Sequence, residues 1–166
     1  MDFLKDILDN FWLISVIAGW LTAQILKVFT GIFREREFSV RAMLFGNGGM
    51  PSSHTAAVMA LATSVALTEG LGSVAFAIAM LLAIIVMNDA MGVRRETGKH
   101  SEALNRIVET LKKKEKKQDG EAAPEENPFK LFKELVGHTP MQVFFGLVTG
   151  VGVALLLSLI PAFGIY

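Results

Sequence analysis

The sequence predicts an all-α fold: an integral membrane helical bundle with about four transmembrane helices and short amphipathic helices on the cytoplasmic side. Composition is the first support, since 52% of the residues are hydrophobic and 19% are charged, against about 45–50% and about 25% in soluble domains. The second is a set of four apolar windows that approach the roughly 20 residues needed to cross a bilayer. A chain of 166 residues is expected to form one domain, residues 1–166.

The first and last windows are long enough to cross a membrane. Residues 11–33 contain Gln24 and Lys27 near one end, and residues 141–163 carry Gln142 as their only strongly polar side chain. The residues before the first window are rich in aspartate, and no small-residue cleavage site follows the window. We therefore expect the first window to remain as an anchor and not to be removed as a signal peptide.

The two middle windows predict a helical hairpin with a turn at residues 69–72. Residues 55–68 give only about 21 Å of helix at about 1.5 Å per residue, which is short, and residues 73–88 form its partner. To span the membrane, the short helix must begin inside the membrane region. The polar residues 51–54 that precede it should therefore lie in a protein-lined pocket.

The distribution of basic residues predicts the orientation in a bacterial cytoplasmic membrane. Eleven of the 16 Lys and Arg residues lie between residues 94 and 133, three lie in the loop 34–41, and none lies in the turn 69–72. Basic loops stay in the cytoplasm, so both basic segments should be inside and both termini outside.

The long inner loop is expected to combine a helix with a mobile stretch. Leu104, Ile107 and Leu111 have amphipathic spacing within residues 100–111, which predicts a helix lying against the membrane or the bundle. The polar segment 112–127 is expected to be mobile. Its lysines either bind anionic lipid headgroups or form a solvated positive-inside loop, and no nucleic-acid partner is expected.

Three polar clusters fall on the cytoplasmic side of the predicted bundle: Lys27 with Arg34, residues 51–54, and Arg94 with His100. Each has an ordinary explanation, because a lysine can snorkel, Ser52 can cap a helix and Arg94 can mark a positive-inside boundary. Together they supply cations, two histidines and the N–H donors of a helix start, which suit the binding and cleavage of a phosphate ester. Ionisable groups cost at least ~2.5 kcal/mol at the membrane centre, so they are usually functional or paired.

The spacing of these clusters resembles a known three-part signature. Lys27-x6-Arg34, then Pro51-Ser52-Ser53-His54, then Arg94-x5-His100 is similar to the motif of the type 2 phosphatidic acid phosphatase superfamily, which also includes vanadium-dependent haloperoxidases. The segments 89–95, 98–100, 104–105 and 137–142 resemble the small, divergent bacterial and plant branch of that superfamily.

The resemblance implies a role for each matched residue. His100 would attack phosphorus to form a phosphohistidine, while His54 would protonate the leaving oxygen and then activate water. The substrate phosphate would be bound by Lys27, Arg34, Ser52, Ser53, Arg94 and Arg95. No metal and no other cofactor is implied.

The chain also departs from the pattern of the superfamily. Glu35 replaces a usual proline and Ser53 a usual glycine, and Leu104 stands where an aspartate normally orients the nucleophilic histidine. Asp89 is the substitute that we favour, although it could instead simply pair with a neighbouring arginine. The alternative substitutes are Glu96, Glu102 and Asn105.

These features predict a membrane lipid phosphatase that acts on an inner-leaflet lipid phosphate, with phosphatidylglycerol phosphate as first guess and phosphatidate and polyprenyl diphosphate behind it. Two other classes stay open: a catalytically silent protein that binds lipid phosphates or organises a partner, and a small transporter whose helices approach at Gly146, Gly150 and Gly152. A homodimer would help so small a bundle to bury its polar groups. His138 could touch substrate or simply close the loop before the last helix.

Overall fold

The computed structural model describes residues 3–32, 49–118 and 138–163, and these residues form helices and no strand. In chain order the elements are α1 (Phe3–Leu8), α2 (Phe11–Ile32), α4 (Ser53–Glu69), α5 (Val74–Met91), α6 (Val93–Gln118), α7 (Pro140–Ser158) and a short 3-10 helix, η1 (Pro161–Phe163). The predicted all-α membrane bundle is confirmed.

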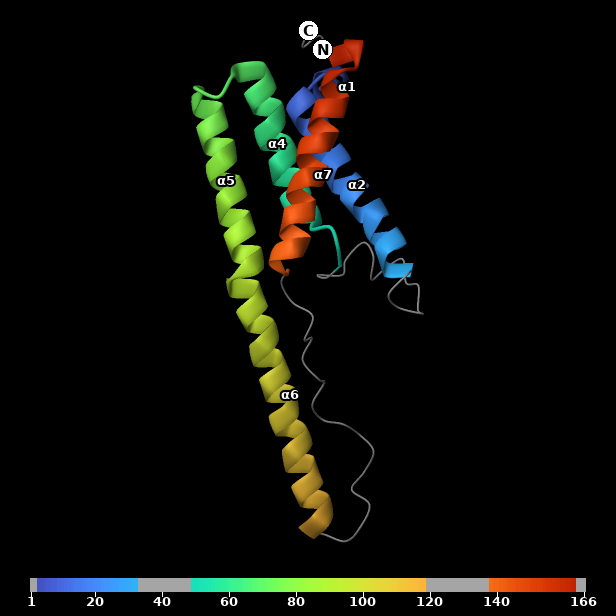
Figure 1. The fold of residues 1–166 in the computed structure, drawn as a ribbon, viewed down its shortest axis with the longest axis vertical. Coiled ribbons are helices and arrows are strands. Elements are labelled where there is room, and N and C mark those ends of the chain that lie inside the picture. Colours follow the sequence, from blue (N-terminus) through green and yellow to red (C-terminus); the bar gives the residue numbers. More distant parts are fainter. Residues whose placement is uncertain (1–2, 33–48, 119–137, 164–166) are drawn as a thin grey trace.

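In the part of the chain that the structure describes, four helices make up the bundle, and α4 lies in the middle of it. α2, α4, α5 and α7 alternate in direction, so the ends of α2 and α5 lie at the same end of the bundle as the starts of α4 and α7 (Figure 1). α4 contacts α2, α5 and α7, and α2 also contacts α7. This topology is what brings distant parts of the sequence together.

Among the described residues, three segments are long and apolar enough to cross a membrane: Phe11–Thr30, Val74–Leu111 and Pro140–Ser158. The remaining predicted span is α4, which has 17 residues and is therefore about 26 Å long. It starts earlier than predicted, at Ser53, because the Ser52 side chain caps it by accepting a hydrogen bond from the Thr55 N–H. The short helix α4 is thus enclosed by three neighbouring helices, α2, α5 and α7.

The packing of the bundle is the reverse of that in a soluble domain. The core is built mostly from small side chains: Ala23, Ala56, Ala60, Ala62, Ala79, Ala83, Ala154 and Ser64 are each less than 5% exposed. Large apolar side chains such as Ile17, Ile78 and Leu156 are exposed instead. In lipid this costs nothing, and small residues let the helix backbones approach closely.

The closest approaches are made at glycines that face α4. A Cβ atom added at Gly150 would lie 2.3 Å from the Ala56 carbonyl oxygen, and one at Gly146 would lie 2.5 Å from the Ser52 carbonyl oxygen. At Gly152, by contrast, nothing lies within 4 Å. Gly146 and Gly150 therefore serve packing within one chain, and they do not leave a helix-docking face open.

The last membrane helix ends at Ser158 and not at residue 163 as predicted from the apolar window. The N–H groups of Leu159 and Ile160 bond to carbonyls three residues earlier, which is 3-10 geometry. Pro161 then follows, and it has no N–H to continue an α-helix. The chain closes with the 3-10 helix η1.

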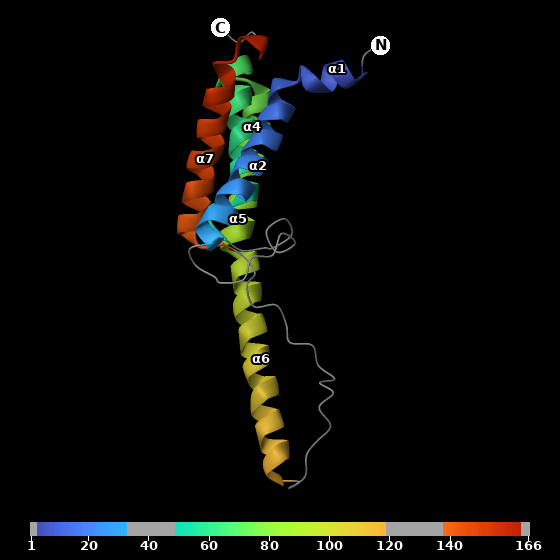
Figure 2. The same ribbon diagram turned by 90° about the vertical axis from the view of Figure 1, so that its right-hand side faces the viewer.

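Helix α6 differs most from the expectation. It continues nearly in line with α5 and projects beyond the bundle, where we expected a short helix lying against the membrane or the bundle (Figures 1 and 2). Helical hydrogen bonding continues on both sides of Gly92, from its N–H to Asn88 and from the Glu96 N–H to its carbonyl. Since α6 reaches Gln118, it includes the start of the segment predicted to be mobile. Residues 119–127 of that segment lie outside the described residues.

Candidate active site

α2 and α5 end, and α4 and α7 begin, at one end of the bundle (Figure 1), and polar side chains from several helices interact there. We call this group the polar cluster; its members are Lys27, Ser52, Ser53, His54, Asp89, Arg94, His138 and Gln142. They come from all three motif segments and from the start of α7.

Lys27 is the buried cation of the polar cluster. Its side chain lies on α2 and is only 9% exposed, and its ammonium donates a hydrogen bond to the Ser53 hydroxyl at 3.0 Å. Within the described residues, no carboxylate lies within ion-pair distance of this ammonium. An anionic ligand at the start of α4 would supply a countercharge that the described residues do not provide.

The start of α4 is held rigidly between α2 and α7. The Ser52 N–H donates to the Gln142 carbonyl at 2.9 Å, and the Thr30 hydroxyl donates to the Met50 carbonyl at 2.5 Å. The Ser52 hydroxyl is fully buried and accepts from the Thr55 N–H and the Thr55 hydroxyl. The helix-capping role allowed for Ser52 is thus present in the structure, and the amide N–H groups that open α4 face the same end of the bundle.

His54 is the solvent-accessible imidazole of the polar cluster. It is the second residue of α4, and its charge is influenced by Arg94, Lys27 and Asp89. Asp89 also forms an ion pair with Arg94, which links the end of α5 to the start of α6. The structural role that we left open for Asp89 is therefore the one observed.

His138 is the buried imidazole of the polar cluster, being 6% exposed. Its backbone N–H donates to the Ala90 carbonyl at 2.9 Å, and its Nδ1 atom lies 3.2 Å from Gln142 Oε1. Burial lowers the pKa of His138, and the nearby Lys27, His54 and Arg94 lower it further, while the hydrogen bond to Gln142 opposes them. At neutral pH the ring is therefore uncharged.

The chain is similar to a known protein family and to a bacterial membrane protein. The profile of the Divergent PAP2 family matches residues 8–153. The chain belongs to the Divergent PAP2 family. It is 42% identical over 155 residues to a Bacillus subtilis protein described as "Uncharacterized membrane protein YuiD", and the match covers 92% of this chain and 97% of the relative. No solved structure matches the chain.

Membership of the Divergent PAP2 family confirms the resemblance drawn from the motifs, and the protein is a membrane protein. The family assignment does not test the individual site residues. Their predicted roles therefore stand as predictions, to be weighed against where the structure places each side chain.

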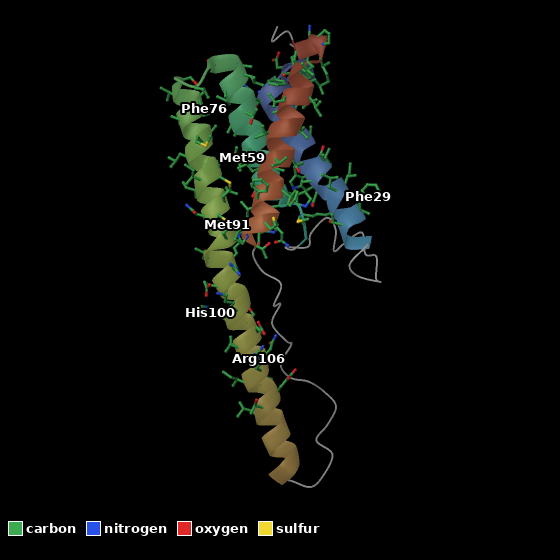
Figure 3. All side chains as sticks on the ribbon, viewed as in Figure 1. Phe29, Met59, Phe76, Met91, His100 and Arg106 are labelled. Carbon is green, nitrogen blue, oxygen red and sulfur yellow. The ribbon has the colours of Figure 1, made fainter. Side chains whose placement is uncertain are left out.

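In this Divergent PAP2 protein, two of the predicted site residues lie away from the polar cluster. His100 and Arg95 are exposed on α6, and Figure 3 shows His100 below the end of the bundle. His100 and Arg95 both interact electrostatically with Glu96, which also lies on α6. Arg34 and Glu35 lie outside the described residues. The nucleophilic role predicted for His100 stays a prediction.

The alternative partners proposed for His100 have other contacts or surroundings. Glu96 accepts from Lys99 at 2.6 Å, Glu102 pairs with Arg106, and Asn105 is buried. Across residues 3–32, 49–118 and 138–163, no group of three or more metal-ligating side chains comes together.

Sequence reasoning left the role of His138 open. The available signal was its position in the 137–142 segment, directly before Thr139, which caps α7. A capping box joins Thr139 and Gln142, because each side chain accepts a hydrogen bond from the backbone of the other. A histidine next to such a fixed helix start is held in one place, and a pattern of residue types alone does not show what it faces.

Proposed function

We propose that this protein is a membrane-bound phosphatase that hydrolyses a phosphate monoester or diphosphate of an inner-leaflet lipid. The observation that carries the proposal is the placement of Lys27. Its ammonium is buried inside a membrane bundle, bonds a neutral hydroxyl at 3.0 Å, and lies beside His54 at a helix start. A phosphate is the anion that suits a cation, hydroxyl and N–H donors in one place.

The polar cluster can stabilise a phosphoryl group as its charge develops. Lys27 on α2 donates a hydrogen bond to Ser53 at the start of α4, and both Lys27 and Arg94 of α6 interact electrostatically with the next residue, His54. Fixed donors of this kind in a low-dielectric site typically lower the barrier by a few kcal/mol each. Catalysis of phosphoryl transfer is mainly positioning and electrostatic stabilisation. The predicted contribution of Arg34 falls outside the described residues.

His54 is proposed as the general acid and base. It is solvent-accessible and directly follows Ser53, the residue that bonds the Lys27 ammonium, so it is suited to exchange protons with a leaving oxygen and an entering water. Proton transfer by a positioned histidine typically contributes about 10²–10⁴-fold to a rate. A nucleophile is also needed; the sequence predicts His100 for this role, but its side chain is exposed on α6, so the proposal does not depend on His100.

The choice of an inner-leaflet lipid depends on the proposed orientation. The basic helix α6 leaves the bundle at the same end as the polar cluster (Figure 2), and basic segments stay in the cytoplasm. The large apolar side chains on the outside of the bundle would place that end at the surface of a bilayer. Phosphatidylglycerol phosphate is the first candidate, followed by phosphatidate and polyprenyl diphosphate.

The activity can be tested with the full-length protein in lipid nanodiscs. Each of the three lipids is supplied in turn, with EDTA present, and released phosphate is measured. We expect release from at least one lipid, inhibition by vanadate, and a fall of about 10²-fold or more in His54→Gln. Binding of the lipid phosphates without any release would instead support a silent binding protein.

The orientation can be tested separately because the chain has no cysteine. Leu71 lies exposed in the turn between α4 and α5, and Ile107 lies exposed on α6. A membrane-impermeant thiol reagent added to intact cells should label Leu71→Cys and leave Ile107→Cys unlabelled until the membrane is opened. The reverse pattern would place the polar cluster on the outer side.

A further inference from the structure

We propose that His138, and not His100, is the nucleophile of this site, and that Gln142 orients its ring. The inference rests on the proposed phosphatase function. His138 is buried at the start of α7 and interacts electrostatically with Lys27, His54 and Arg94, the groups proposed to hold and protonate the substrate. It is therefore the imidazole that the fold brings to His54.

The hydrogen bonds of Gln142 determine which ring nitrogen of His138 carries the lone pair. The Thr139 N–H donates to Gln142 Oε1 at 2.8 Å, so this atom is the amide oxygen, which only accepts. The Nδ1 atom of His138 lies 3.2 Å from the same oxygen and must be the protonated nitrogen. In the neutral ring, Nε2 is then unprotonated, and its lone pair can attack phosphorus.

This arrangement explains how the site can work without the usual aspartate, which Leu104 replaces. A histidine nucleophile needs a group behind its second nitrogen that fixes the tautomer and the ring orientation. Here the Gln142 amide provides that acceptor, and the capping box at the start of α7 fixes the amide in turn. A carboxylate near His100 is not required.

The backbone around His138 is fixed on both sides. Its own N–H is bonded to the Ala90 carbonyl at the end of α5, and the next residue, Thr139, is the N-cap of α7. A nucleophile held in this way avoids the entropy loss of being positioned at each turnover. His100, by contrast, is exposed on the projecting helix α6.

The proposed steps balance in atoms and protons. The lone pair of His138 Nε2 forms a bond to phosphorus, the bond from phosphorus to the lipid oxygen breaks, and that oxygen takes a proton from protonated His54. Water then attacks phosphorus, the nitrogen–phosphorus bond breaks, and His54 accepts the proton released by the water. The products are the dephosphorylated lipid and inorganic phosphate, and both histidines return to their starting states.

The decisive experiment locates the covalent phosphate in the unmodified protein. Nanodisc-embedded protein is mixed with whichever of the three lipids it hydrolyses, labelled with ³²P in the terminal phosphate, and quenched in alkali, where phosphohistidine is stable. Peptide mapping should place the label on His138. Label on His100 or on any other residue would overturn the inference and leave the phosphatase proposal intact.

Matched variants give a second test. His138→Asn keeps an N–H donor for Gln142 but removes the attacking nitrogen, and should reduce phosphate release roughly 10³-fold or more. His100→Asn is the control and should stay within about threefold of the unmodified protein. Added imidazole should restore part of the activity of His138→Gly, which a purely structural role would not allow. Full turnover in His138→Asn would overturn the inference, and no release from the unmodified protein would overturn both proposals.

Discussion

The polar cluster at the end of the bundle and the projecting helix α6 carry similar residue types in different surroundings. In the cluster, Lys27 and His138 are buried, and each is hydrogen-bonded to a neutral side chain. On α6, Arg106 pairs with Glu102 on an exposed surface, and His100 is exposed (Figure 3). The difference teaches that converging helix ends can bury and fix a cation and a histidine, whereas a helix that leaves the bundle leaves the same residue types exposed.

Among substitutions of the cations in the two regions, the largest expected effect is the loss of activity on neutralising the buried Lys27. Lys27→Met keeps the length of the side chain and removes its charge, so kcat/KM for the lipid phosphate should fall about 10²–10³-fold, as for the loss of one donor to a developing anion. Arg106→Met removes a cation from α6 and should leave kcat/KM nearly unchanged. Equal losses in both variants would erase the contrast between the two regions.

A comparable contrast exists within α7, between the glycines that face α4 and one that does not. Gly150→Ala would place a methyl group 2.3 Å from the Ala56 carbonyl oxygen, so the helices must separate at a cost of about 1–3 kcal/mol. Gly152→Ala meets nothing within 4 Å and should stabilise the helix by about 0.5–1 kcal/mol. Thermal unfolding in detergent measures both.

The expected order of unfolding temperatures is Gly152→Ala, the unmodified protein, then Gly150→Ala. A Gly150→Ala variant as stable as the unmodified protein would show that α4 and α7 are farther apart than described. Because the two substitutions are identical and lie on one helix, differences in helix propensity cannot explain opposite results.

A smaller effect should follow from pH, because the two regions hold their histidines differently. The pKa of His138 is lowered by burial and then by nearby positive charge, so its folded-state value lies below the unfolded value of about 6.5. His138 therefore contributes to the free energy of unfolding above about pH 6.5. This contribution is lost as the pH falls through the folded-state pKa. The unfolding temperature should decrease accordingly between pH 7 and pH 5.

Two substitutions sharpen this pH test. His138→Asn should remove the part of the decrease that His138 causes. Gln142→Glu retains an acceptor at the capping position of α7 but adds a negative charge, which raises the pKa of His138 and should reduce the decrease. A decrease that is identical in the two variants and the unmodified protein would mean that His138 takes no part in it.

Most of the bundle could be predicted from local features of the sequence. Apolar windows located the membrane helices, and the turn between α4 and α5 falls at Gly70, whose φ of +81° favours glycine. The end of α7 was missed because an apolar window does not register that Pro161 lacks an N–H. The direction of α6 was missed because it depends on whether helical hydrogen bonding continues across Gly92.

Sequence could predict a residue of the candidate site only if that residue lies at a helix end that packs against another helix end. Lys27 and Ser53 are far apart in sequence but are joined because α2 ends where α4 begins. The importance of His138 could not be seen, because it follows from burial and from a hydrogen bond whose direction requires coordinates. His100 has the expected spacing from Arg94, yet spacing does not specify which way a helix runs after it leaves the bundle.

The smallest expected effect concerns the exposed ion pairs on α6. Glu102→Gln removes the charge that pairs with Arg106 across one helical turn, and exposed pairs of this spacing contribute about 0.3–0.5 kcal/mol. The helix should therefore lose little stability, and the polar cluster at the end of the bundle should keep its activity. Circular dichroism and phosphate release measure these two quantities. If Glu102→Gln lowered phosphate release as much as Lys27→Met, the part of α6 beyond Arg94 would belong to the site and the division between the two regions would be wrong.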